Sequence, residues 1–231
     1  MQAIVPVLML SIAVVLGVGT ALEAQELDRI YADQYMPLRS ELMIADVDGG
    51  NPRKLVPGTE IDYNASFSAD GQWVVFTSDR SSSADIYRVR VDGRDLERLT
   101  DSTAFDDQAA LSPDGSYVVF ETNDQLDASD VNGTSDIYLT ELGTVNFTPV
   151  SLDDDGAPRG DCTWPSASDD ADRVAFAAPD PTSGIDQIYL WERQTGSVRL
   201  LSTDLDALPA ADDCSEPMIS GSGNAVVFLS Q

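Results

Sequence analysis

The segment from residue 130 to residue 136 carries the side chains best suited to binding a metal ion. It places side-chain oxygens on Asp130, Asn132 and Asp136 around a glycine, Gly133. Alternating oxygen donors around a glycine are how a loop wraps a hard cation such as calcium. Glu141 follows, but the flanking helices of an EF-hand are absent from the sequence pattern. The alternative is an Asx-turn loop whose side chains cap their own backbone.

The sequence contains no histidine. This excludes Ser-His-Asp and Cys-His catalysis, histidine-based zinc motifs and acid–base work by imidazole. Walker loops, dinucleotide fingerprints and basic patches are also missing. We therefore expect a non-enzymatic protein with no catalytic residue, and calcium is the one cofactor to consider.

The charge balance is strongly acidic. Thirteen Lys and Arg stand against 40 Asp and Glu, which gives a net charge of -27, and Lys54 is the only lysine. Such a surface repels nucleic acid and anionic lipid headgroups. It suits cations, a basic partner or a salty medium, and the alternative is simply an acidic secreted protein.

The N-terminal segment is apolar and uncharged from Ala3 to Leu22. Small residues follow it, so residues 1–24 are predicted to be a secretory signal cleaved after Ala21 or Ala24. The stretch is also about long enough for an uncleaved N-terminal anchor, in which case the protein would contact a membrane. Either interpretation places the folded part in the periplasm or outside the cell, after a polar leader at 25–36.

The rest of the chain is repetitive. Four segments align without gaps, at residues 65–76, 109–120, 165–176 and 217–228. Each has serine at its fourth position and phenylalanine at its twelfth; the serines are Ser68, Ser112, Ser168 and Ser220, separated by 44, 56 and 52 residues. Asp-Gly or similar turn pairs between short apolar runs predict a β-hairpin in each copy, and a second hairpin follows the first three.

These repeats predict an all-β fold, a β-propeller of four-stranded antiparallel blades with about four blades' worth of strands over residues 37–231. Complete units are expected at 61–100, 105–151 and 161–202. The segment 41–56 matches 85–100, so it is the second half of a unit, and 215–231 is the first half of one. The halves could pair and close a ring. We expect instead an incomplete or open ring, and completion by another chain is a further alternative.

The segments FSADGQWVVFTSDRSSSADIYRVRVDGRDLERLT, LSPDGSYVVFETN and ELMIADVDGGNPRKLV strongly resemble the TolB-type β-propeller repeat. The stretch NDQLDASDVNGTSDIYLTEL resembles a variant found in exported bacterial propellers. The resemblance covers about residues 41–231. It implies a propeller fold in which the repeated residues are structural, and it says little about function.

In a propeller, the loops that enter the innermost strands converge near the central channel. Cys162 and Cys214 both stand six residues before a repeat serine. We therefore expect a disulfide between neighbouring blades, with Trp164 covering it; two free thiols are the alternative. Carboxylates are expected to face the channel mouth and to bind a cation or a basic peptide, with solvated loop carboxylates as the alternative; they are Asp62, Asp106, Asp107 and Glu216.

The leading functional hypothesis is an exported, non-enzymatic propeller that binds a protein, a peptide or a glycan through its loop face. A second is the accessory propeller of a larger prolyl-oligopeptidase-type hydrolase. A third is a calcium- or salt-stabilised structural element of a surface protein. The fold alone does not decide among them.

Overall fold

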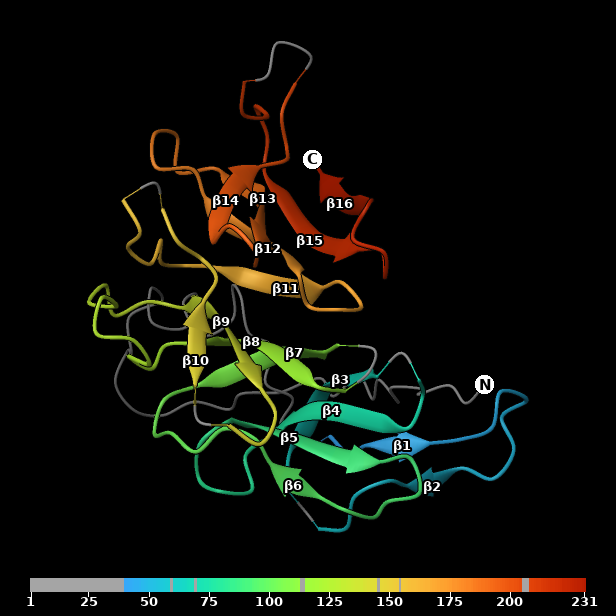
Figure 1. Ribbon diagram of the computed structural model, residues 1–231. Helices are drawn as coiled ribbons and strands as arrows, with labels where there is room; N and C mark the ends of the chain where they lie inside the picture. The colour runs from blue at the N-terminus through green and yellow to red at the C-terminus, as the bar shows by residue number, and fades with distance from the viewer. Residues whose placement is uncertain are drawn as a thin grey trace, which may run out of the picture.

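The computed structural model describes residues 40–231, except 59, 69, 113, 114, 145, 154 and 205–207 (Figure 1). The described residues form five antiparallel sheets and no helix. The first sheet has two strands, β1 (Met43–Ile44) and β2 (Arg53–Lys54). The last also has two, β15 (Cys214–Ile219) and β16 (Val226–Ser230). Between them lie three four-stranded sheets: β3 (Asp62–Phe67), β4 (Trp73–Ser78), β5 (Asp85–Arg90) and β6 (Glu97–Arg98); β7 (Asp106–Leu111), β8 (Tyr117–Thr122), β9 (Asp136–Glu141) and β10 (Phe147–Pro149); β11 (Thr163–Ala167), β12 (Arg173–Pro179), β13 (Asp186–Glu192) and β14 (Ser197–Leu200).

The repeat serine explains why each unit opens with a tight hairpin. The Ser68 hydroxyl donates to the Asp70 carboxylate (2.6 Å) and accepts the backbone N–H of Trp73 (3.0 Å). Gly71 takes the left-handed conformation that the turn requires, with φ of 67°. The other copies of the serine accept the same backbone N–H, from Tyr117, Arg173 and Ala225. A single hydroxyl therefore fixes the turn that joins the first two strands of each unit.

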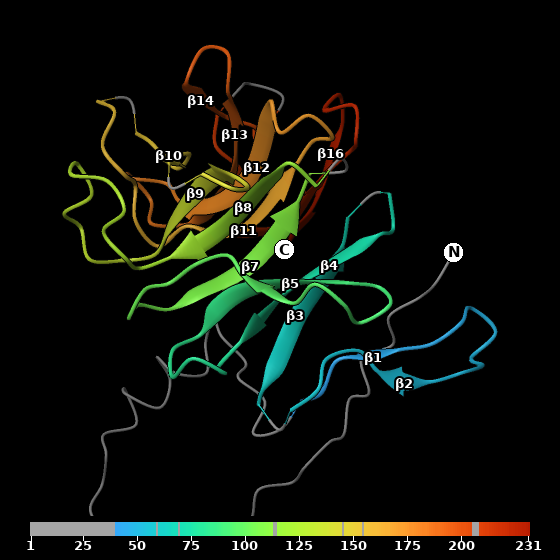
Figure 2. The same cartoon turned by 60° about the horizontal axis from the view of Figure 1, so that its bottom comes forward.

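The sheets stand in a row with their first strands innermost, so that β3 contacts β7, β7 contacts β11 and β11 contacts β15 (Figures 1 and 2). The second strand of each four-stranded sheet supplies core residues to both neighbouring sheets. In β4, Phe76 packs with Leu42 and Ile44 of the preceding sheet, whereas Val75 packs with Val118 of the following sheet. Apolar residues on both faces of a strand are what burial between two sheets requires. This is the predicted propeller arrangement, and the fold class is confirmed.

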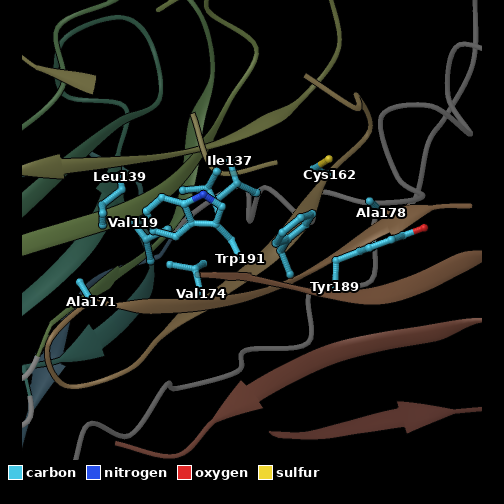
Figure 3. Close-up of a cluster of buried hydrophobic side chains, with 11 residues drawn as sticks. Val119, Ile137, Leu139, Cys162, Ala171, Val174, Ala178, Tyr189 and Trp191 are labelled. Carbon is cyan, nitrogen blue, oxygen red and sulfur yellow. The ribbon is translucent and has the colours of Figure 1, made fainter. Parts of the chain in front are cut away.

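Figure 3 shows one of these cores, between the β7–β10 and β11–β14 sheets. Trp191 on β13 lies 2% exposed at its centre. It is surrounded by aliphatic side chains of both sheets, among them Val119, Ile137, Leu139 and Val174. Burying a tryptophan of this kind contributes on the order of 3 kcal/mol.

The row of sheets is an open arc. The β1–β2 and β15–β16 sheets are separate and lie at opposite ends of the row (Figures 1 and 2). The two half-units therefore do not pair with each other within one chain, and the alternative of a ring closed in that way is wrong for this structure.

The predicted signal or anchor and the polar leader lie outside the described residues. Within residues 40–231 as described, we find no helix long and apolar enough to cross a membrane.

Candidate functional site

All four inner strands are interrupted at the same repeat position. The pairing of each with its neighbour shifts register between Tyr63 and Ser66 in β3, and at the corresponding places in β7, β11 and β15. The residue inside each shift has a positive φ of 48° to 58°. We call these four residues the bulge row; they are Asn64, Gln108, Trp164 and Glu216.

The bulge row carries backbone strain. A positive φ is uncommon for residues other than glycine, and for a bulky residue such as Trp164 it is a clear outlier that costs roughly 1–3 kcal/mol. Bulges of this kind re-aim side chains and are common next to binding and active sites. Four occurrences at one repeat position make this a built feature of the inner strands.

Polar contacts link the bulge row from strand to strand. The Asn64 amide on β3 donates to both carboxylate oxygens of Asp107 on β7, at 2.9 and 3.0 Å. The Gln108 side-chain oxygen on β7 accepts the backbone N–H of Trp164 on β11, at 3.0 Å. Trp164 is 42% exposed and Glu216 is also exposed. The row therefore offers solvent two amides, an indole and a carboxylate side by side across the inner strands.

Asp107 lies beneath the row. It is 1% exposed and also accepts from the Thr77 hydroxyl (2.6 Å) and from the backbone N–H of Gln108 (2.7 Å). Burial raises the pKa of this carboxyl, and the hydrogen bonds from Thr77 and Asn64 oppose the rise. Asp107 is thus an internal acceptor that ties β3, β4 and β7 together.

Two further predicted channel-mouth residues are also buried. Asp62 is 3% exposed and pairs with Arg80 at 2.7 Å. Asp106 is 1% exposed, and burial raises its pKa against hydrogen bonds from Thr100 and Thr122. The structure therefore places Asp62, Asp106 and Asp107 away from solvent, and Glu216 is the only one of the four at the surface.

The loop predicted to bind calcium is closed by its own hydrogen bonds. Asp130 accepts from the Tyr138 hydroxyl (2.9 Å), and the Asn132 amide donates to Asp136 (2.8 Å). The side-chain oxygen of Asn132 accepts a hydrogen bond from the backbone N–H of Thr134, as in an Asx turn. Over the described part of the chain, no group of three or more Cys, Asp or Glu residues is placed to hold a metal ion.

The predicted disulfide is not formed, because Cys162 and Cys214 are both free and buried. Cys162 packs with Ile137 of the preceding β7–β10 sheet (Figure 3), and Cys214 packs with Ile188 of the preceding β11–β14 sheet. Residues at one repeat position point in the same direction relative to their own sheet. Each thiol therefore points towards the preceding sheet, and the two thiols lie in different intersheet cores. Burial raises the pKa of Cys162 well above its usual value, which keeps the thiol unreactive. Trp164 therefore covers no disulfide.

Sequence reasoning missed the bulge row. Its members share no residue type and none is a glycine, and only Asn64 is of a type enriched in the left-handed region, so propensity gave no signal common to the row. The usable signal was positional, because all four stand four residues before a repeat serine. Their chemical variety, on otherwise similar strands, is typical of a surface that contacts something else.

Fold and bulge row together define a β-propeller arc with an exposed, strained row on its inner strands. Residues 37–129 match the family described as the TolB beta propeller domain. A 47-residue stretch is 34% identical to the Tol-Pal system protein TolB of Desulfosudis oleivorans, over 20% of this chain and 11% of that protein. The family match places TolB-type β-propeller repeats in residues 37–129 of the chain.

Solved structures agree on the fold. The chain is similar to TolB from Acinetobacter baumannii with a TM-score of 0.62 and 20% identity, over 86% of this chain and 45% of that one. It is also similar to a puromycin-hydrolyzing peptidase of Mycobacterium tuberculosis, with a TM-score of 0.53 and 19% identity over 75% of this chain and 26% of that one. The chain thus spans about half the length of the solved TolB and a quarter of the peptidase.

Proposed function

We propose that this protein is an exported, non-enzymatic propeller that binds a protein or peptide partner along the bulge row. The single observation that carries the proposal is Trp164, a 42% exposed tryptophan held in a left-handed conformation on an inner strand. An exposed aromatic side chain on a rigid strand loses little entropy on binding, and tryptophan is enriched at binding hot spots. The N-terminal apolar segment and the TolB-type repeats support export.

The charge around the row favours a basic partner. Glu216 belongs to the row itself, and nearby loops add exposed carboxylates at Asp161, Asp212 and Asp213. The net charge of -27 raises the association rate of a cationic peptide and repels an anionic one. We therefore expect an extended peptide with lysine or arginine beside an apolar side chain that stacks on Trp164.

The test is a titration of the purified protein with such a basic peptide, followed by tryptophan fluorescence and calorimetry. Trp164→Gly is the informative variant, because glycine adopts a φ of 58° without strain and the fold is preserved. Loss of a hot-spot side chain of this size predicts at least about 30-fold weaker binding. Leu96→Ala is the matched control, because Leu96 is 40% exposed and lies in the β5–β6 turn, at the opposite end of its sheet from the bulge.

Binding that Trp164→Gly leaves unchanged would refute the bulge row as the site. Equal affinity for an acidic peptide of the same length would refute the preference for a basic partner. A weakening by Leu96→Ala as large as that by Trp164→Gly would show that the effect is global rather than local.

A further inference from the structure

Two side-chain amides of the bulge row have their orientation fixed by their partners. A carboxylate only accepts hydrogen bonds, and the Asn64 amide nitrogen donates to both oxygens of Asp107, at 2.9 and 3.0 Å. A backbone N–H only donates, so the Gln108 side-chain oxygen is the atom that accepts from Trp164, at 3.0 Å. Neither amide can be turned over without losing its partner. The Asn64 oxygen and the Gln108 nitrogen are therefore the two groups left for another molecule.

These two groups have no partner within the described part of the chain. Among the described residues, nothing donates to the Asn64 side-chain oxygen and nothing accepts from the Gln108 side-chain nitrogen. Asn64 is exposed and Gln108 is half-buried, and both unpartnered atoms are accessible to solvent. The bulge row therefore offers one free acceptor and one free donor.

A buried carboxylate holds the two amides on a common base. Besides the Asn64 amide, Asp107 accepts from the Thr77 hydroxyl at 2.6 Å and from the backbone N–H of Gln108 at 2.7 Å. It thus links the Asn64 side chain on β3 to the Gln108 backbone on β7, and these two inner strands lie side by side (Figures 1 and 2). The acceptor and the donor are in place on neighbouring strands before a ligand binds, which lowers the entropy cost of binding.

An acceptor and a donor on neighbouring strands match the main chain of an extended peptide. Each residue other than proline offers one N–H and one C=O, and in an extended chain both point to the same side. An anion would meet the Asn64 oxygen, and a metal ion would meet the Gln108 amide protons, so neither fits both groups. A sugar hydroxyl also combines donor and acceptor, but it carries no positive charge to match the net charge of -27.

Resting on the binding function proposed above, we propose that Asn64 and Gln108 bind the main chain of the partner. One backbone N–H of an extended peptide donates to the Asn64 side-chain oxygen, and the C=O of the same residue accepts from the Gln108 side-chain nitrogen. Every residue except proline presents these two groups, so the pair fixes the position of the peptide without selecting its sequence. Selectivity is left to Trp164 and to the carboxylates around the row.

The first experiment removes the donor. A synthetic peptide of alternating lysine and leucine is titrated into the protein and its variants by calorimetry. Gln108→Glu keeps an oxygen for the Trp164 N–H but replaces the donating nitrogen by an acceptor, so binding should weaken at least about fivefold. Gln194→Glu is the matched control and should leave the affinity unchanged. It adds the same charge at an exposed residue in the β13–β14 turn, at the other end of the β11–β14 sheet from the bulge.

The second experiment removes the acceptor and its ligand N–H separately. Single peptide bonds of the probe are replaced by esters, each of which lacks one N–H. At one position the ester should weaken binding to the unchanged protein at least about fivefold. The same ester should have no further effect on Asn64→Gly, in which the oxygen is gone and glycine adopts the φ of 48° without strain. Because the ester is in the ligand, its effect on the unchanged protein does not depend on the folding of any variant.

Three results would overturn main-chain recognition: an ester scan with no position whose effect disappears in Asn64→Gly, equal affinities for Gln108→Glu and Gln194→Glu, or a neutral glucose oligomer that binds as tightly as the peptide. If Trp164→Gly still weakens peptide binding when the first or second of these is found, the proposed binding function stands and only the main-chain contact is wrong. If Trp164→Gly also leaves peptide binding unchanged, the bulge row is not the site and both proposals fail.

Discussion

Asp136 on β9 provides the most direct test of the electrostatics of this fold. Its carboxylate is 1% exposed. It accepts hydrogen bonds from the Ser151 hydroxyl (2.7 Å), the Asn132 amide (2.8 Å) and the backbone N–H of Gly160 (3.2 Å). Burial nevertheless dominates and raises its pKa from 3.8 to about 6, while these three hydrogen bonds oppose the rise.

The sign of the effect on stability follows from that direction. Because the pKa in the folded protein lies above the value in the unfolded chain, protonation of Asp136 favours folding. The stabilisation is complete below about pH 4 and is lost as the pH rises through about 6. A shift of this size corresponds to at most about 3 kcal/mol in the free energy of unfolding.

The perturbation is Asp136→Asn, and the assay is urea unfolding at half-unit pH steps between pH 4 and 8. Between pH 4 and 7, the free energy of unfolding of the unchanged protein should fall by at most about 3 kcal/mol relative to that of the variant. This difference in pH dependence does not depend on how stable the variant is at any one pH. The matched control is Asp127→Asn in the same loop, because hydrogen bonds from Ser129 lower the pKa of Asp127. The free energy of unfolding of the unchanged protein, minus that of Asp127→Asn, should not fall as the pH rises. Parallel curves for the unchanged protein and Asp136→Asn would refute this reasoning.

The next repeat shows that a neutral side chain fits this position. Gln187 replaces Asp136 there, and its side-chain oxygen accepts from the Ser202 hydroxyl at 2.7 Å and from the backbone N–H of Ala210 at 3.2 Å. These distances equal those from Ser151 and Gly160 to Asp136. The hydrogen bonds of the position therefore do not require a charge, so the pH dependence belongs to the carboxylate itself.

Two further predictions concern the site. Asp107→Ala should lower the free energy of unfolding by urea by about 2 kcal/mol or more, because Thr77 and Asn64 lose their hydrogen-bond acceptor. Asp155→Ala is the control, because Asp155 is exposed. Equal effects of the two substitutions would contradict the internal role of Asp107. A calcium titration of the melting temperature decides between the interpretations of the 130–136 loop: its internal hydrogen bonds predict no change, and a rise abolished by Asp130→Asn would establish a calcium site.

Much of the fold could be predicted from the sequence because the signals are local. The repeat serines and turn glycines fix hairpins within about ten residues of themselves, and the alternation of Val and Phe marks strands buried on both faces. The burial of Asp62 and Asp106 could not be predicted in this way. It depends on Arg80 and on the Thr100 and Thr122 hydroxyls, which reach them only after the strands have paired.

The disulfide prediction failed for a related reason. Residues at the same position of successive repeats lie on neighbouring sheets, which suggests that they are in contact. Because the repeats have the same structure, however, their side chains also point in the same direction. Cys162 and Cys214 therefore follow each other along the row without facing each other. In a repeat protein, a direct bridge needs residues from different repeat positions, as the contact between Asn64 and Asp107 illustrates: these residues occupy adjacent repeat positions on neighbouring strands.

At one buried polar position the side chain changes from repeat to repeat while the backbone hydrogen bonds stay the same. In the third strand of each four-stranded sheet, this position directly precedes a buried isoleucine; it is occupied by Asp85, Asp136 and Gln187. Asp85 is neutralised by Arg98, with two contacts of 2.9 and 2.8 Å. Among the described residues the hydrogen-bond donors to Asp136 are neutral, and Gln187 carries no charge. All three sites keep the same hydroxyl cap on the following isoleucine N–H, from Thr100, Ser151 and Ser202. Because the frame is held by that cap, the neighbouring side chain is free to change between repeats, and the bulge row on the inner strands likewise carries four different side chains on one backbone conformation.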